Sequence, residues 1–266
     1  MSRIPDVYAD LIAEGEALDS LVTRLGPGQW ALPTPAPGWT IAHQIAHLAS
    51  TARLARAAAT DPAAFALMTT GAAEDFDAAV TRVLQPYLVG LPTALLTRWR
   101  LERAQAARAL ASLPPDQMVP WVARKLPAGM LASAGIMELF AHGQDIADTV
   151  GTRIEPTDRI RHLVNFAVRN WAFGYLMRGQ TPPDEQFRFE LTAPSGQAWE
   201  YGPADAGQRI SGPAVDFCLL TTRRRHRGDL SLVASGPDAE RWLDIAQAYR
   251  GAPGPGRRPG QFASSR

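Results

Sequence analysis

Hydrophobic and polar positions follow a helical period along most of the first 180 residues. In the stretch 4–25 apolar residues recur every three or four positions, and a Gly-Pro pair follows at 26–27. A second periodic stretch starts after Thr40, a residue type that caps helix N-termini, and continues to about residue 60. These patterns predict two amphipathic helices joined by a proline-rich segment.

The same period predicts three more helices before residue 180. Pro86 and Pro92 interrupt the first of them, and a second proline-rich connector precedes the next. The expected ranges are 72–84 continuing at 93–112, then 129–150, and finally 156–178, which carries an aromatic stripe. Helices of this kind bury their apolar faces against one another, so a helical bundle is expected over residues 1–180.

The pattern changes after Gln180, where alternating apolar residues predict strands that end at Pro-, Ser- or Gly-containing turns. The expected elements are strands at 187–193, 197–202 and 209–211, a helix from Pro213, a strand at 229–235 and a helix at 237–249. The predicted fold class is therefore α+β, with a small α+β domain over 181–250. The tail, 251–266, lacks apolar periodicity and is expected to be disordered.

Composition and charge narrow the classes of partner. The 266 residues carry 27 basic and 26 acidic side chains, a net charge of +1, which gives no reason to expect nucleic acid or an anionic membrane. No apolar run approaches about 18 residues and no signal core is visible, so neither a membrane span nor secretion is expected. The one cysteine, Cys218, excludes an internal disulfide and favours a cytoplasmic protein. It lies in an apolar helix, where a core role is expected rather than a nucleophilic one.

Three side chains on two of the expected helices form the strongest candidate site. Glu138 and His142 are four residues apart, so on a helix they lie one turn apart on one face. His47 lies on the second expected helix. If these helices pack side by side, two imidazoles and a carboxylate converge into the ligand set of a catalytic metal site with an open position. The alternative is structural, with a Glu138–His142 ion pair and a histidine bonded within the core.

Two further polar residues lie close to these candidates in the sequence. His43 and His47 are four residues apart, so they could themselves form a zinc-ligand pair on one helix. The glutamate that lies between the two histidines in metalloproteases is absent here, which argues against this pair. His43 is therefore the catalytic candidate, expected to line the mouth of the site or to bond to a ligand. Asp145 follows His142 by three residues and is expected either to accept its second N–H or to serve on the helix surface.

Two motifs surround the candidate ligands, PGWTIAHQIAHLA at 37–49 and ELFAHGQDIAD at 138–148. Together they resemble the mycothiol-dependent maleylpyruvate isomerase family of the DinB-like metal-binding proteins, and RISGPAVDFCLLTTRRRH at 209–226 resembles the C-terminal domain of that family. The resemblance implies a four-helix bundle in which His47, Glu138 and His142 hold a divalent metal, usually zinc, with nickel as an alternative. The family commonly has an acidic residue where this chain has His43, so the substrate is left open.

The resemblance also implies a cosubstrate, the small thiol mycothiol of actinobacteria. A thiol at the open metal position is deprotonated at neutral pH and attacks a small electrophilic substrate without a protein cysteine. Addition to a conjugated alkene followed by loss of the thiol gives cis–trans isomerisation, whereas displacement of a leaving group gives S-transfer. The expected function is a metal-dependent thiol S-transferase or isomerase, in natural-product biosynthesis or detoxification. A thiol-independent metal hydrolase and a non-catalytic metal-binding stress protein are the alternatives.

One dense basic cluster, RRRHR at 223–227, is not part of this candidate site. Arg223, Arg224 and Arg225 are candidates to bind a carboxylate of mycothiol or of the substrate. The alternative is a solvated helix end, whose positive charge complements the helix dipole. The aromatic stripe at 156–178 is either the floor for the second domain or a contact between copies, so a monomer and a homodimer both stay open.

Overall fold

The computed structural model describes residues 6–72, 75–122 and 124–262, and it has the predicted α+β fold with a helical N-terminal part. The chain divides into two compact units, Met1–Arg153 and Ile154–Arg266. This division lies earlier than the expected boundary after residue 180, because the helices between 161 and 176 belong to the second unit. Helical periodicity indicates which face of a helix is buried, but not which core receives it. No helix of the described chain has both the length and the apolar character needed to cross a membrane.

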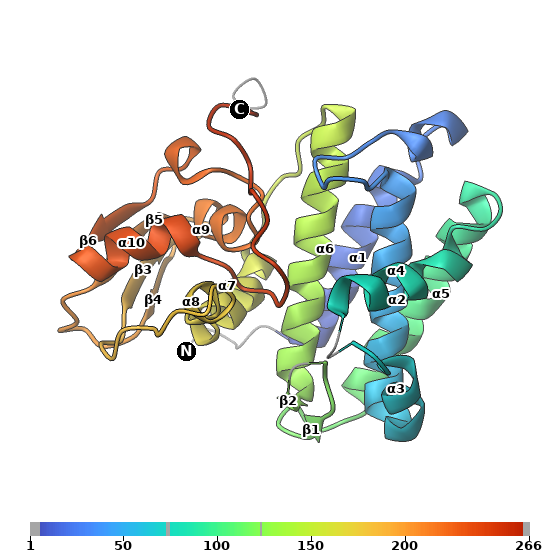
Figure 1. Cartoon of the computed structure of the whole chain (residues 1–266), viewed down its shortest axis with the longest axis horizontal. Helices are drawn as coiled ribbons and strands as arrows, with labels where there is room; N and C mark the ends of the chain where they lie inside the picture. Colours follow the sequence, from blue (N-terminus) through green and yellow to red (C-terminus); the bar gives the residue numbers. More distant parts are fainter. Residues whose placement is uncertain (1–5, 73–74, 123, 263–266) are drawn as a thin grey trace. The chain divides into compact units, whose positions relative to one another are not determined.

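Within the described residues, four long helices dominate the first unit. They are α1 (Val7–Val22), α2 (Ile41–Thr60), α5 (Pro92–Ala111) and α6 (Ala128–Val150). α2 packs against both α5 and α6, and α1 packs against the same two helices. Figure 1 shows α6 running alongside α1 and α2. These helices match the expected stretches within a few residues, although positions 4–5 of the first lie outside the described residues.

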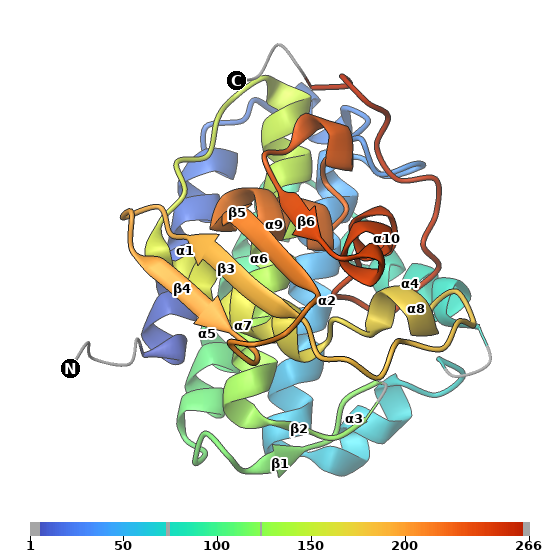
Figure 2. The same ribbon diagram turned by 90° about the vertical axis from the view of Figure 1, so that its left-hand side faces the viewer.

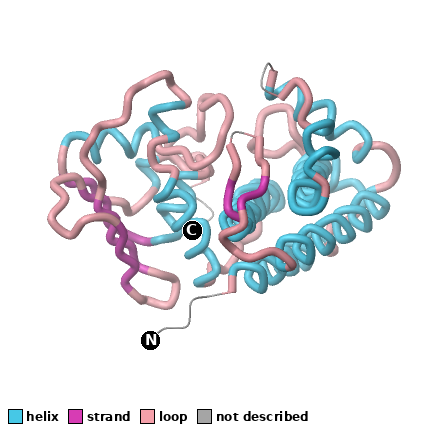
Figure 3. The backbone as a smooth tube through the Cα atoms, turned by 90° about the horizontal axis from the view of Figure 1, so that it is seen from below, coloured by secondary structure: helices cyan, strands magenta, loops and turns pink. Residues whose placement is uncertain are grey.

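The connectors of the first unit carry short elements. Among these elements the sequence pattern predicted only the helix at 72–84, and positions 73–74 of that range lie outside the described residues. The elements are η1 (Pro27–Ala31), α3 (Pro62–Met68), α4 (Phe76–Leu84), η2 (Gln85–Tyr87), and the antiparallel strands β1 (Met118–Val119) and β2 (Leu126–Pro127). In Figure 3, where helices are cyan and strands magenta, the first unit is mostly helix.

Local side chains explain where several of these helices begin and end. The carboxylates of Asp6, Asp61 and Asp75 each accept a backbone N–H from the first turn of the helix that follows. α6 ends at Gly151, whose backbone is left-handed with φ 65°. That conformation stops a helix at little cost only when the residue lacks a Cβ atom.

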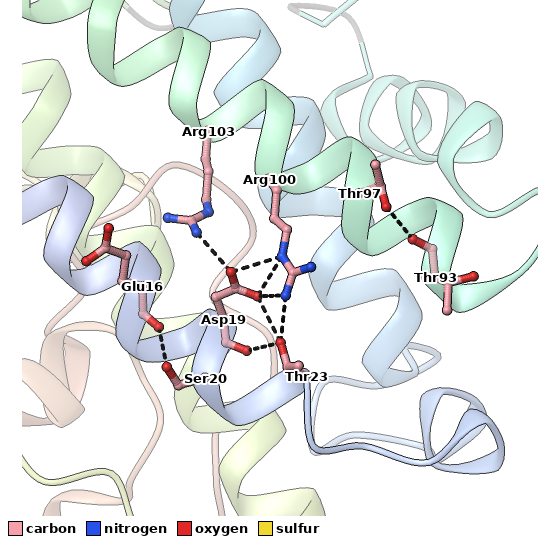
Figure 4. Close-up of polar contacts among 8 residues, drawn as sticks. All are labelled: Glu16, Asp19, Ser20, Thr23, Thr93, Thr97, Arg100 and Arg103. Carbon is pink, nitrogen blue, oxygen red and sulfur yellow. Dashed lines mark hydrogen bonds and ion pairs between the residues drawn. The ribbon is translucent and has the colours of Figure 1, made fainter.

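A cluster of ion pairs fastens α1 to α5 (Figure 4). Nη2 of Arg100 lies 2.7 Å from Oδ1 of Asp19, and Nη2 of Arg103 lies 3.0 Å from Oδ2. Burial alone would raise the pKa of the Asp19 carboxyl. The hydrogen bonds from Arg100 and Thr23, together with the charges of both arginines, outweigh burial and lower that pKa.

The second unit combines one sheet with short helices. Its helices are η3 (Asp158–Ile160), α7 (Arg161–Arg169), α8 (Phe173–Leu176), α9 (Ala214–Thr221), η4 (Arg227–Asp229) and α10 (Pro237–Ile245). The single helix expected at 156–178 is therefore broken. At Asn170 the side-chain amide donates to the Phe166 carbonyl at 2.8 Å, so it competes with the backbone where the helix would continue.

The sheet of the second unit has the order β4-β3-β5-β6. Its strands are β3 (Arg188–Thr192), β4 (Ala198–Tyr201), β5 (Arg209–Pro213) and β6 (Val233–Ser235). β3 pairs in parallel with β5, and the other two pairings are antiparallel. Figure 2 looks onto this sheet, with α9 packed behind it.

Aromatic residues fill the core between the sheet and its helices. The ring of Trp242 lies 5.6 Å from that of Phe189 and 5.9 Å from that of Phe217, measured between centroids. Cys218 is fully buried on α9, which agrees with the core role expected of it. Residues 251–262 of the tail that was expected to be disordered form no helix or strand. Even so, the backbone N–H of Gly260 donates to Asp229 at 2.9 Å.

We expect Asp19→Asn to lower the free energy of unfolding by about 1–2 kcal/mol at neutral pH, because two guanidinium groups lose their counter-charge. The folded-state pKa of Asp19 lies below the unfolded value, near 3.8. The stabilisation is therefore complete above that value and is lost as the pH falls through the folded-state pKa. Urea unfolding at neutral pH and at about pH 3 measures both effects.

Glu16→Gln is the matched control, since Glu16 is an exposed carboxylate on the same helix. Its effect on stability should be small at both pH values. If the two variants lose the same stability, the cluster does not fasten α1 to α5.

Candidate metal centre

Two helices bring the three predicted ligands together. His47 projects from α2, and Glu138 and His142 project from one face of α6. Oε2 of Glu138 lies 3.2 Å from Nε2 of His47 and 3.1 Å from Nε2 of His142. One ligand atom from each residue lies within 4.8 Å of the others, so the predicted convergence is present in the structure.

The cluster is partly enclosed but still accessible. The side chains of Glu138, His47 and His142 are 27%, 15% and 10% exposed. Burial alone would raise the pKa of the Glu138 carboxyl, but hydrogen bonds and positive charge from His142 and His47 outweigh it and hold the pKa well below its ordinary value. The carboxylate is therefore charged, as a metal ligand must be.

The donor set fits a divalent cation. Nδ1 of His142 contacts the amide oxygen of Gln44, and because that oxygen only accepts, Nδ1 carries a proton. In the neutral ring of His142, Nε2 then carries a lone pair that faces the Glu138 carboxylate oxygen. Two acceptors at this distance repel each other unless a proton or a cation lies between them. Two imidazole nitrogens and one carboxylate oxygen would suit zinc, leaving a coordination position open.

The second ring nitrogen of His47 has a different environment. Its Nδ1 is buried and has no hydrogen-bond partner among the described residues. The Trp39 ring lies beside both imidazoles. It stacks on His142 at 5.8 Å between centroids and 16° between planes, and it lies 5.3 Å from His47. Trp39 therefore forms one wall of the centre.

His43, the catalytic candidate, does not belong to the group of three ligand atoms. The backbone N–H of Thr40 donates to Nδ1 of His43 at 3.3 Å, and the Thr40 hydroxyl lies 2.8 Å from the same atom, closing the first turn of α2. A backbone N–H only donates, so in the neutral ring the proton of His43 is on Nε2. Burial lowers the pKa of the His43 imidazole, which favours that neutral ring.

The three arginines predicted to bind an anion have different surroundings. Arg223 and Arg225 line a pocket of about 170 Å³ in the second unit, together with Arg227 and Arg257. Asp244 is the one acidic residue among the lining, and it pairs with Arg227 at 3.1 Å. Arg224 is not among the lining residues, and its Nη1 donates to the Thr222 carbonyl at 2.6 Å.

Arg223 has an unusual backbone conformation. Arg223 has φ 59°, a left-handed conformation that no other non-glycine residue of the described chain adopts. It directly follows the C-cap of α9, where the backbone N–H of Arg224 donates to the Leu219 carbonyl at 2.8 Å. The Nε of Arg223 is buried without a hydrogen-bond partner among the described residues. An unsatisfied guanidinium N–H beside a basic pocket favours an anionic ligand.

Sequence reasoning did not single out Gln44, although it lies between the two histidines of the HxxxH motif. Its contact with His142 crosses from α2 to α6, so no spacing along either helix could reveal it. Asp145 was expected either to accept the second N–H of His142 or to lie on the helix surface. It is fully buried on α6, so the surface role is wrong.

Two family models and two related proteins match this chain. Residues 11–147 match the family model described as the mycothiol maleylpyruvate isomerase N-terminal domain, and residues 183–235 match a model described as wyosine base formation. Two uncharacterized proteins of Mycobacterium tuberculosis, from strains CDC 1551 and H37Rv, are each 44% identical over 249 residues. Those alignments cover 94% of this chain and 97% of each relative.

Solved structures share the fold at low sequence identity. The crystal structures of the mycothiol-dependent maleylpyruvate isomerase and of a histidine-to-alanine mutant superpose with TM-scores of 0.57 and 0.58 at 15% identity. The superpositions cover 88% of this chain and 96% of each of those chains. Half of the sequence matches the family model and the fold agrees over most of the chain. The chain therefore belongs to the mycothiol maleylpyruvate isomerase family.

Proposed function

We propose that this protein is a divalent-metal enzyme that uses mycothiol to isomerise, or to transfer sulfur to, a small electrophilic substrate. The observation that carries the proposal is the convergence of His47, Glu138 and His142 on one point between α2 and α6. Membership of a family whose model is named for a mycothiol isomerase supports the choice of thiol. Zinc fits the mixed nitrogen and oxygen donors, and nickel is the alternative.

The metal and the side chains have separate roles in this proposal. A divalent cation, when bound, lowers the pKa of a thiol enough for thiolate to be present at neutral pH. The chain supplies no thiol of its own there, because Cys218 is fully buried in the second unit. His43 lies one turn before His47 on α2, and its Nε2–H is available to donate a hydrogen bond to an oxygen on which negative charge develops.

For isomerisation, the thiolate sulfur adds to one carbon of a conjugated alkene and the electron pair moves onto the neighbouring carbonyl oxygen. The former double bond is then single and rotates. Return of the electron pair reforms the alkene, breaks the C–S bond and releases the thiolate. The thiol is regenerated and no oxidant or reductant is consumed, so one small thiol and one electrophile suffice.

The arginine pocket of the second unit is proposed to bind an anionic group of the thiol conjugate or of the substrate. Arg223 and Arg225 line it, while the charge of Arg227 is neutralised by Glu240 and Asp244. Arg223 also acts on its neighbour Arg178, whose pKa is lowered first by burial and then by this like charge. Excess positive charge of this kind is relieved by an anion.

The first test is metal content. Purified protein is expected to carry about one equivalent of zinc or nickel. His47→Ala and Glu138→Gln should each lose most of it, because two ligands hold a divalent cation far less tightly than three. Elemental analysis and the rise in Tm on adding zinc measure the loss. His162→Ala, a histidine of α7 outside the cluster, is the control and should keep its metal.

The second test is thiol dependence. With zinc-loaded protein and maleylpyruvate as the probe, cis–trans conversion followed by absorbance should need mycothiol and should fall by at least about a hundredfold in His47→Ala. Mass spectrometry of the products distinguishes S-transfer from isomerisation. Turnover that is equal with and without the thiol would instead favour the hydrolase alternative.

The third test concerns the anion pocket. Arg223→Gln and Arg225→Gln should each raise KM for the anionic reactant about tenfold, the effect of one lost charge-assisted hydrogen bond, with a smaller change in kcat. Glutamine is an L residue like arginine, so the cost of the left-handed backbone at position 223 is unchanged. Arg224→Gln is the matched control, and equal KM values in all three variants would remove the pocket from the proposed function.

A further inference from the structure

We propose that Gln44 is a positioning residue that, together with Thr34, keeps the proton of His142 on Nδ1 and turns its Nε2 lone pair toward Glu138. The inference rests on the proposed metal centre. It adds two residues to that centre that touch neither the cation nor the substrate. They act through a chain of hydrogen bonds whose direction is set by the backbone.

The chain of hydrogen bonds starts at the carbonyl oxygen of Trp39, which can only accept. The Thr34 hydroxyl donates to this oxygen at 2.9 Å, and the Thr34 backbone N–H donates to it at 2.8 Å. A hydroxyl whose single proton is used in this way can only accept from its next partner. The free side of Thr34 Oγ1 is therefore an acceptor.

Gln44 continues the chain from α2. Its Nε2 donates to Thr34 Oγ1 at 2.8 Å, which fixes the orientation of the amide group. The amide oxygen is then the atom in contact with Nδ1 of His142, on α6. Gln44 has no exposed surface, so water does not compete for either bond. Reversing the amide would place a donor against the imidazole, and the Thr34 hydroxyl would have to give up its bond to the Trp39 carbonyl in order to donate to Gln44.

This chain of hydrogen bonds decides which ring nitrogen of His142 can bind a metal. Whatever the state of Nε2, Nδ1 keeps its proton, so the lone pair used for a metal is the one that faces Glu138 Oε2 at 3.1 Å. The other histidine lacks this control, because Nδ1 of His47 is buried without a partner among the described residues. The two imidazole ligands are therefore unequal, and the orientation of His142 depends on residues outside the ligand set.

The same loop holds His142 in a second way. Residues 33–40 close on themselves through an antiparallel bridge between Pro33 and Thr40, and the Trp39 ring stacks on the His142 imidazole. The backbone carbonyl and the ring of one residue thus both act on the same ligand. This loop couples the start of α2 to a ligand on α6.

Three variants separate positioning from packing. Gln44→Leu removes the acceptor, and the zinc Kd, measured by competition with a chromophoric chelator, should rise about 10- to 100-fold. Gln44→Glu keeps an acceptor oxygen against Nδ1, and its second oxygen can accept the Thr34 hydroxyl proton once that hydroxyl turns away from the Trp39 carbonyl. The zinc Kd should therefore stay within about twofold of the wild type or fall. Thr34→Val leaves Gln44 in place but frees its amide to rotate, so a smaller loss in the same direction is expected.

Ser50→Ala is the matched control. Ser50 is a buried residue of the same helix, and its hydroxyl donates to the His47 carbonyl at 2.9 Å. The variant loses one hydrogen bond and some stability, but its zinc Kd should stay within about twofold of the wild type. Similar losses of zinc affinity in Gln44→Leu and Ser50→Ala would overturn the proposal, and so would a loss in Gln44→Glu as large as in Gln44→Leu.

A readout on metal-free protein keeps this inference separate from the proposed function. In protein labelled with ¹⁵N-histidine, the Nδ1–H of His142 should give a signal protected from exchange with water, assigned by its absence in His142→Ala. The signal should persist in Gln44→Glu and Ser50→Ala and disappear in Gln44→Leu. If it is absent from the wild type the positioning role fails, whereas a protected signal in protein that binds no zinc would sink the proposed function alone.

Discussion

The packing of α2 against α6 is the contact on which the candidate site depends. One imidazole comes from the first helix, and the carboxylate and the second imidazole come from the other, so neither helix carries a ligand set alone. A partly buried carboxylate is costly without compensation, and here two imidazoles lie within 3.2 Å of it. The same electrostatic requirement that keeps these groups paired when no metal is bound makes them a suitable donor set for a cation.

The loop that leads into α2 links the stability of the helix to the order of the site. His43 closes the first turn of the helix through Thr40. The indole of Trp39, the residue before Thr40, stacks on His142, and the Trp39 carbonyl accepts from Thr34, which bonds to Gln44. A histidine at position 43 can therefore complete a helix cap, because Nδ1 accepts a backbone N–H as a carboxylate does.

The second unit has its own aromatic core and a pocket lined by several arginines. Strand β5, which pairs in parallel with β3, leads directly into α9. The chain leaves the end of that helix through Arg223, whose backbone is left-handed. This turn separates neighbouring side chains: Arg223 and Arg225 reach the pocket, whereas Arg224 bonds back to the chain. Three consecutive arginines are thus chemically distinct, although their sequence is uniform.

The sequence by itself determined the features that depend on local spacing. Apolar periodicity was enough for the long helices and for the strands after residue 180, and the four-residue spacing of Glu138 and His142 was enough to put both on one face of α6. Only the tertiary structure decided which residues meet across elements: the contact of Gln44 with His142 and the assignment of α7 to the second unit. The physical reason is that helix geometry fixes neighbours within about one turn, whereas contacts between helices depend on how whole faces pack.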